Sequence, residues 1–257
     1  MNILILGFGT VGTLTAAILR ERGHRVVGVR RSPGAHGADR VIMGDLAAPE
    51  LYADIASERF DAVLLAANPG IRRGRDNRLA AGAALVNRHL PHVRLIYTGT
   101  TAVYADAGGS DVQEDGPVDL GDPATVALLA IERAVIAHGD ALVLRCPALV
   151  GPTRSHARER LERGETSVRG SLERPFSFLH EQDCAELCAD ALVGAFGSGM
   201  LNAASPRRLS VRDYYGIIGA DIGGTGVVGD GAPAPARWID AGRLHAMCPT
   251  RIWRDPG

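Results

Sequence analysis

Three glycines near the amino terminus have the spacing of a dinucleotide-binding turn. Gly7, Gly9 and Gly12 follow an apolar run at residues 3–6 and precede a helical pattern, which is the context that the G-x-G-x-x-G motif requires. Glycines there permit a tight turn and bring backbone amides close to a pyrophosphate at the start of the helix. We therefore expect this turn to bind a dinucleotide, and the alternative is tight packing of strand on helix without a ligand. The turn also contains Phe8, Thr10 and Val11.

The end of the second predicted strand distinguishes between the two nicotinamide cofactors. Residues 25–29 lead into Arg30, Arg31 and Ser32, at the place where an NAD-binding protein carries an acid, about 20 residues beyond the glycines. Two guanidiniums and a hydroxyl suit a 2′-phosphate instead, because arginine binds phosphate through paired hydrogen bonds. The sequence therefore predicts NADP in preference to NAD. A solvated surface pair of arginines is the competing interpretation.

Two further strand ends supply candidate cofactor contacts. Asp45 and Leu46 close the third predicted strand, where an adenine edge could lie, although Asp45 could equally cap the next helix. Ala66, Ala67 and Asn68 end the fourth strand. Small residues there would let a dinucleotide pass over the sheet edge, and tight packing would explain the alanines equally well.

The chain contains no lysine, and all 28 basic residues are arginine. Richness in alanine, glycine and arginine suggests a GC-rich genome, which explains the missing lysines at the surface. At a catalytic position the lack of lysine matters, because arginine stays protonated near neutrality and cannot replace an ammonium whose pKa can be tuned.

The pattern of apolar runs predicts a doubly wound parallel sheet, a Rossmann fold of the α/β class. Short apolar runs alternate with helical patterns through the first half of the chain, which is typical of a sheet covered by helices on both faces. We expect a dinucleotide-binding core at residues 1–150 and a smaller substrate lobe at 151–257 with segments that return to the core, forming one cooperative unit. Strands are predicted at 2–6, 25–29, 41–43, 61–66, 93–97, 141–145 and 176–179, and helices at 11–22, 74–90, 125–138, 153–163 and 181–195.

Composition indicates a small-molecule partner. A net charge of -1 and a pI near 6.7 disfavour a general nucleic-acid or membrane-surface role, because phosphates and anionic lipids would not be attracted overall. We expect no signal peptide and no transmembrane segment, and hence a cytoplasmic protein. The four cysteines have no metal-ligand spacing and are expected to be buried thiols, so no metal site is predicted.

The whole chain resembles the extended short-chain dehydrogenase/reductase family, specifically its atypical NAD-dependent epimerase/dehydratase-like members. The matching pieces occur in the family's order and span nearly the full length. They are the glycine turn, Gly44-Asp45-Leu46, Thr100-Thr101-Ala102-Val103-Tyr104, Glu114-Asp115-Gly116-Pro117, residues 144–152 (LRCPALVGP), residues 178–183 (FLHEQD) and Leu201-Asn202.

This resemblance implies a catalytic apparatus that the chain only partly contains. The family uses a Ser or Thr to orient a substrate oxygen, a Tyr to pass a proton, and a Lys four residues later that lowers the pKa of the Tyr. Counting back eight residues from Glu132 puts the Tyr position at Ala124 and the Lys position at Leu128. Both roles are therefore vacant, while Thr100 matches the Ser/Thr position.

Three residues are candidates for the remaining chemistry. Thr100 is expected to touch substrate or, alternatively, to hydrogen-bond its own loop. Tyr104 is the nearest replacement phenol, although the resemblance implies a structural role for it. His180 has a suitable pKa for acid or base catalysis, but the resemblance implies that it links the lobe to the sheet.

Two arginines are candidates for substrate binding. Arg145 ends a strand beside the expected nicotinamide, and Arg154 follows Gly151-Pro152, so either could bind a carboxylate or phosphate; ion pairing within the lobe is the alternative. Pro147 belongs to the cofactor contacts that the resemblance implies.

Three classes of function remain open from the sequence. The first is an NADP(H)-binding oxidoreductase or epimerase of small-molecule metabolism, possible without the Tyr/Lys pair because the cofactor carries the hydride step. The second is a non-redox lyase, cyclase or isomerase on the same fold, and the third is a nucleotide-sensing protein without catalysis. The resemblance also makes a homodimer plausible, through the helices predicted at 74–90 and 125–138.

Overall fold

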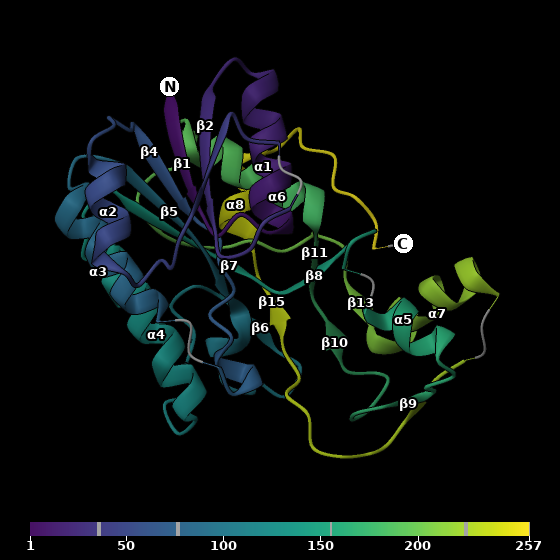
Figure 1. The fold of residues 1–257 in the computed structure, drawn as a ribbon. Coiled ribbons are helices and arrows are strands. Elements are labelled where there is room, and N and C mark those ends of the chain that lie inside the picture. The colour runs from purple at the N-terminus through teal and green to yellow at the C-terminus, as the bar shows by residue number, and fades with distance from the viewer. Residues whose placement is uncertain (35–36, 76–77, 155, 224–225, 257) are drawn as a thin grey trace.

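The computed structural model describes residues 1–34, 37–75, 78–154, 156–223 and 226–256. Seven parallel strands form one sheet in the order β12-β7-β5-β4-β1-β2-β3 (Figure 1). The order reverses at β1, so the predicted doubly wound parallel sheet is confirmed. The strands are β1 (Asn2–Leu6), β2 (Arg25–Arg30), β3 (Arg40–Met43), β4 (Ala62–Leu65), β5 (Arg94–Thr100), β7 (Ala141–Cys146) and β12 (Gly199–Asn202).

Helices cover both faces of this sheet because successive side chains of each strand point in opposite directions. In β1, Leu4 and Leu6 pack towards the layer formed by α2 (Pro49–Ala56), α3 (Leu79–His89) and α4 (Pro123–Ile136). Ile3 and Ile5 pack towards the opposite layer. That layer consists of α1 (Thr10–Glu21), α6 (Glu181–Leu192) and α8 (Gly242–Met247). Burial on both faces explains the nearly continuous apolar runs of the strands.

The predicted helix at 74–90 begins only at Leu79 among the described residues, and residues 76–77 lie outside them. A short 3-10 helix, η1 (Ile71–Arg73), precedes it. Gly70 and Gly74 flank η1 with φ of 75° and 68°, in the left-handed region that favours glycine. These two glycines break the helical pattern and form a compact turn at residues 70–75.

Beyond residue 150 the chain forms a smaller lobe and also returns to the sheet. Figure 1 shows α5 (His156–Glu162) and α7 (Val211–Ile222) to one side of the sheet, together with several short strands. α6 packs on α1, and β12 extends the sheet through β7. The short strands of the chain are β6 (Asp111–Val112), β8 (Ala148–Val150), β9 (Ser167–Val168), β10 (Pro175–Phe176), β11 (Phe178–His180), β13 (Leu209–Ser210), β14 (Val228–Gly229) and β15 (Trp238–Ile239).

The carboxyl-terminal tail is fastened to α6 by charged groups. Arg254 donates its backbone amide to the Asp183 carboxylate at 2.9 Å and its guanidinium to Glu186 at 2.8 Å. Arg251 also pairs with Glu186, at 2.9 Å. Asp183 is fully buried, so the tail supplies the partner that this carboxylate needs.

Candidate functional site

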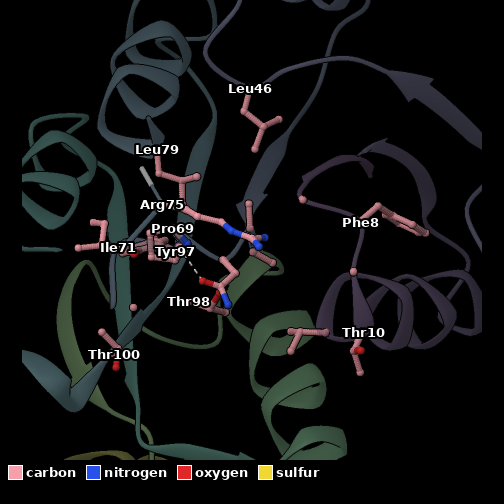
Figure 2. A pocket seen from close by; sticks show the side chains of 18 of the residues that line it. Phe8, Thr10, Leu46, Pro69, Ile71, Arg75, Leu79, Tyr97, Thr98 and Thr100 are labelled. Carbon is pink, nitrogen blue, oxygen red and sulfur yellow. Dashed lines mark hydrogen bonds between the residues drawn. The ribbon is translucent and has the colours of Figure 1, made fainter. Parts of the chain in front are cut away.

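A cavity of about 710 Å³ runs along the carboxyl ends of the sheet strands. Its walls come from the loops after β1, β2, β3, β4, β5 and β7, so residues far apart in sequence meet at the point where the strand order reverses. Figure 2 shows Phe8 and Thr10 on one side of this cavity and Pro69, Ile71 and Tyr97 on the other. The predicted cofactor residues line this cavity with the exception of Gly12: Gly7, Phe8, Gly9, Thr10, Val11, Arg30, Arg31, Ser32, Asp45, Leu46, Ala66, Ala67, Asn68 and Pro147.

The glycine turn has the geometry that its spacing predicts. Gly7 has a φ of +95°, and an added Cβ would lie 2.4 Å from the backbone nitrogen of Ala67. Gly9 precedes α1, and a Cβ there would meet no atom within 4 Å. Gly12 lies behind the turn, where a Cβ would stand 2.9 Å from the Gly7 carbonyl oxygen. Gly9 thus leaves open space before the first amides of α1, whereas Gly7 and Gly12 permit close packing.

The loop after β2 adds positive charge to the cavity wall. Arg30, Arg31 and Ser32 all line it. The Arg30 guanidinium lies close to the backbone at Gly34, where an added Cβ would stand 3.0 Å from Nη2. The loop therefore forms a positively charged part of the cavity wall beside β2.

Asp45 forms a local turn and does not cap the following helix. Its carboxylate accepts the Ala47 amide at 3.0 Å, whereas the N-cap of α2 is Ala48. Among the lining residues that the structure describes, Asp45 is the only carboxylate, and it faces six arginines. The arginines are Arg30, Arg31, Arg72, Arg73, Arg75 and Arg154.

The loop between β4 and α3 contributes arginines that sequence reasoning missed. Arg72 donates to the Ala102 carbonyl oxygen at 2.7 Å and to the Thr125 hydroxyl at 3.1 Å, and it pairs with Asp122 at 2.9 Å. Arg73 and Arg75 also line the cavity. Reading residues 74–90 as one helix obscured this loop, although Gly70 and Gly74 were a signal for it.

The Thr100 hydroxyl bonds to its own loop, and the residue also borders the cavity. Its hydroxyl oxygen accepts the Ala102 amide at 3.1 Å. A hydroxyl has one proton to donate in addition to its acceptor sites. Thr100 can therefore donate to a substrate oxygen while its own loop holds it in place.

The positions of the family's Tyr and Lys hold no titratable side chain. Leu128 lines the cavity and is 3% exposed. Ala124, one turn earlier in α4, has its amide bound to the Asp122 carboxylate at 3.0 Å. The position at which the resemblance implies a lysine therefore lies at the cavity wall.

The structure places Tyr104 and Arg145 in the core, outside the cavity lining. The Tyr104 hydroxyl donates to Asn202 Oδ1 at 2.7 Å, and the Arg145 guanidinium lies 4.9 Å from the centre of the Tyr104 ring. Arg145 donates to both oxygens of Glu132, at 3.0 and 2.7 Å. Burial raises the pKa of the Tyr104 phenol, and Arg145 offsets only part of that rise. These contacts argue against catalysis by Tyr104 and substrate binding by Arg145.

His180 occupies a structural position at the start of α6. Its Nδ1 accepts the Gln182 amide at 3.1 Å and caps the helix. β11 ends at His180 and pairs with β8. His180 therefore lies where this strand pair joins α6. His180 is outside the cavity lining, which favours the linking role over catalysis.

Arg154 lies in a loop that is held against the glycine turn. The Thr153 hydroxyl donates to Glu181 Oε2 at 2.6 Å and lies 3.4 Å from the Thr10 hydroxyl. Glu181 is 3% exposed and also accepts the Thr153 amide at 3.0 Å. This buried clamp holds the segment before Arg154, which lines the cavity near Cys146.

The cysteines are structural in the positions described. Cys146, Cys184 and Cys188 are buried, and Cys248 is half-buried. The contact with Cys184 and burial together raise the pKa of the Cys146 thiol, which therefore stays protonated near neutrality. No cluster of potential metal ligands occurs among the described residues. Nor does any helix in the described part of the chain combine the length and apolarity needed to cross a bilayer.

A second cavity of about 660 Å³ lies in the lobe. Arg174 and Arg212 line it, together with residues around Gly170 and Gly229. Arg212 pairs with Glu173 at 2.6 Å. Burial lowers the pKa of the Arg174 guanidinium, so a bound anion would compensate for its lost hydration.

Comparison with known proteins identifies related folds. The family model described as the NAD dependent epimerase/dehydratase family matches residues 3–195. No curated protein matches the chain. The Bordetella bronchiseptica enzyme WbmH, solved in complex with NAD+, is 19% identical, with 99% of this chain and 94% of that chain covered and a TM-score of 0.81.

Two further solved structures show the same fold similarity. MoeE5, in complex with UDP-glucuronic acid and NAD, is 23% identical over 99% of this chain and 94% of that chain, with a TM-score of 0.81. The dTDP-glucose 4,6-dehydratase of Bacillus anthracis, in complex with NAD, is 16% identical over 97% and 90%, with a TM-score of 0.79. The similarity extends over the lobe as well as the sheet.

Proposed function

Because the chain belongs to the NAD-dependent epimerase/dehydratase family, we propose that it is an NADP(H)-binding oxidoreductase or epimerase of small-molecule metabolism. One observation carries the proposal: the glycine turn, the Arg30-Arg31-Ser32 segment and Thr100 line a single cavity. The residues fit a dinucleotide, because Gly9 leaves the start of α1 open and small residues follow β4.

The proposed preference for NADP rests on charge. The solved relatives named above hold NAD. In this chain, β2 ends in Arg30 and continues into Arg31 and Ser32, which suit a 2′-phosphate. A guanidinium–phosphate hydrogen bond contributes about 1.5–3 kcal/mol, so the two arginines favour the phosphorylated cofactor.

The preference is tested by titrating NADPH and NADH against the wild type and the Arg30→Ala/Arg31→Ala variant. Loss of even one charged hydrogen bond predicts at least about tenfold weaker NADPH binding, with little change for NADH. Arg59→Ala is the matched control, since Arg59 is an exposed arginine outside the cavity. Equal weakening of both cofactors would contradict the assignment.

In the proposed reaction, the chain's own residues orient the substrate. When bound, the nicotinamide supplies or accepts the hydride. The Thr100 hydroxyl donates a hydrogen bond to the substrate oxygen and keeps its proton, while it accepts the Ala102 amide. Without the Tyr/Lys pair, proton transfer at that oxygen loses general acid catalysis, which contributes about 10²- to 10⁴-fold, and the reaction is correspondingly slow.

The proposed substrate is a small molecule that carries an anionic group. Arg154 lines the main cavity, and Arg174 lines the lobe cavity. MoeE5 binds UDP-glucose and UDP-glucuronic acid, so nucleotide sugars form the first panel to test. Oxidation of NADPH is followed at 340 nm with 4-keto sugar nucleotides and simple carbonyl compounds, and the reverse reaction is followed with the corresponding alcohols.

A second candidate function is favoured by Leu128. A buried leucine where the family carries lysine suits a protein that binds the dinucleotide without hydride transfer, either a lyase, cyclase or isomerase or a nucleotide sensor. NADPH binding without turnover across the substrate panel would support this alternative. Turnover with any member of the panel would exclude it.

A further inference from the structure

Arg75 extends its charged side chain into the main cavity. Figure 2 shows its side chain reaching between Leu46 and Thr98, towards the side where Phe8 and Thr10 lie. Its guanidinium makes no hydrogen bond or ion pair with any residue that the structure describes. A guanidinium presents several donors in a rigid fork that matches phosphate oxygens.

The backbone that carries Arg75 is fixed by its own loop. The Arg75 amide donates to the Gly70 carbonyl oxygen at 3.1 Å, and the Gly74 amide donates to Ile71 at 3.0 Å. The Gly70 amide in turn donates to Asn68 Oδ1 at 2.8 Å. These bonds hold the chain in a compact turn, so the base of the Arg75 side chain is preformed at the cavity wall.

Arg72 anchors the same loop and differs from Arg75 in its contacts. It bonds to Ala102, Thr125 and Asp122, which ties the loop to the start of α4. The two arginines therefore have separable roles: Arg72 fastens the loop, and Arg75 remains available to a ligand.

Across the cavity from Arg75 lies the start of α1. The first amides of a helix have no intrahelical acceptor and attract anions. Gly9 leaves the space before them open, because a Cβ there would meet nothing within 4 Å. An anion bound at this turn would be exposed on its other side, which is the side that Arg75 enters.

We propose that Arg75 is a second anchor for the cofactor, binding its pyrophosphate from the side opposite α1. This inference rests on the proposed dinucleotide-binding function. It assigns Arg75 to the phosphates that NAD and NADP share, whereas Arg30 and Arg31 are assigned to the 2′-phosphate. Arg75 therefore governs affinity for both cofactors without selecting between them.

Two fragments of the cofactor separate these assignments in a calorimetric titration. ADP-ribose contains the pyrophosphate and lacks the 2′-phosphate, whereas adenosine 2′-phosphate has the reverse composition. Arg75→Ala is expected to weaken the binding of ADP-ribose, NADH and NADPH by one common factor, about tenfold to a hundredfold for one lost charged hydrogen bond. Adenosine 2′-phosphate should bind the variant within about twofold of wild type. Arg75→Lys retains the charge without the fork and should fall between the two.

Two control variants are compared with Arg75→Ala. Arg59→Ala should leave all four affinities unchanged, and Arg30→Ala/Arg31→Ala should weaken adenosine 2′-phosphate but spare ADP-ribose. Unchanged ADP-ribose binding by Arg75→Ala, or a loss confined to ligands with the 2′-phosphate, overturns the inference and leaves the proposed function standing. A wild-type protein that binds none of the four ligands refutes the proposed function and this inference together.

Discussion

The buried pair of Arg145 and Glu132 predicts a large loss of stability when one partner is removed. Both side chains are nearly inaccessible, at 4% and 6% exposed, and two hydrogen bonds join them. Arg145 also donates to the Glu114 carbonyl oxygen at 3.1 Å. Burial opposes the charge of Arg145, but the bond to Glu132 outweighs it and raises the pKa of the guanidinium. Arg145 therefore keeps its positive charge in the core.

Arg145→Met leaves the Glu132 carboxylate buried and without its cation. Breaking such a pair costs about 3–5 kcal/mol, which corresponds to a fall in melting temperature of roughly 6–20 °C for a chain of this size. Replacing both partners, in Arg145→Met/Glu132→Leu, removes the uncompensated charge and should recover most of that loss. The double-mutant cycle should therefore give a coupling energy well above the 0.5 kcal/mol expected of independent sites.

The measurement is urea unfolding followed by circular dichroism for the wild type, both single variants and the double variant. Single losses below about 1 kcal/mol, or additive losses in the double variant, would refute the structural assignment of Arg145. A stable Arg145→Met protein whose KM for substrate rises would restore the substrate-binding interpretation. Val193→Ala, an exposed site on the same sheet face as α6, serves as a control for ordinary surface substitution.

Three further predictions concern the glycine turn, the carboxyl-terminal tail and Leu128. Gly7→Ala should lower the melting temperature, because φ at this position is +95° and the new Cβ meets Ala67. Gly9→Ala should keep the wild-type melting temperature but lose NADPH affinity, because its Cβ projects into open space. Burial raises the pKa of Glu186, but Arg254 and Arg251 outweigh this effect and lower the pKa below 4.5. The stability that these ion pairs contribute is therefore present above pH 4.5 and is lost as the pH falls through the lowered pKa. Arg254→Met should reduce the difference in unfolding free energy between pH 7 and pH 3.5. Leu128→Lys places an ammonium at a site only 3% exposed, so it should destabilise the protein measurably in urea; Leu128→Met is the control expected to cost less than about 1.5 kcal/mol.

The sheet could be predicted because its strands are buried on both faces. Runs such as residues 3–6 and 141–145 are apolar throughout, and the intervening helical patterns require parallel connections. A helix after Asp45 was expected without bounds, and α2 is only eight residues long, with Pro49 in its first turn. The predicted strand at 176–179 is divided into β10 and β11, which pair with different partners. That division depends on tertiary pairing, which a short apolar run does not encode.

The residues that line the cavity could be predicted where they directly follow the carboxyl end of a strand. Gly9 and Arg30 are examples, because the carboxyl ends of parallel strands meet at one edge. The direction of a side chain is not given by that rule. Arg145 lies at the end of β7 but points into the core, because Glu132 on α4 offers a buried carboxylate there. Tyr104 is likewise drawn inward by Asn202, which lies far along the chain.

The absence of lysine bears both on the proposed phosphate contacts and on the proton relay that the resemblance implies. Arginine cannot be tuned to a pKa near neutrality, so no guanidinium can replace the ammonium that activates a phenol. The same property suits arginine to phosphate, where a permanent charge and a planar fork are advantages. The six arginines that line the cavity therefore fit the proposed phosphorylated cofactor, and Arg75 is proposed to strengthen its binding. The proton relay that the resemblance implies uses an ammonium beside the phenol, and at the lysine position the chain carries Leu128.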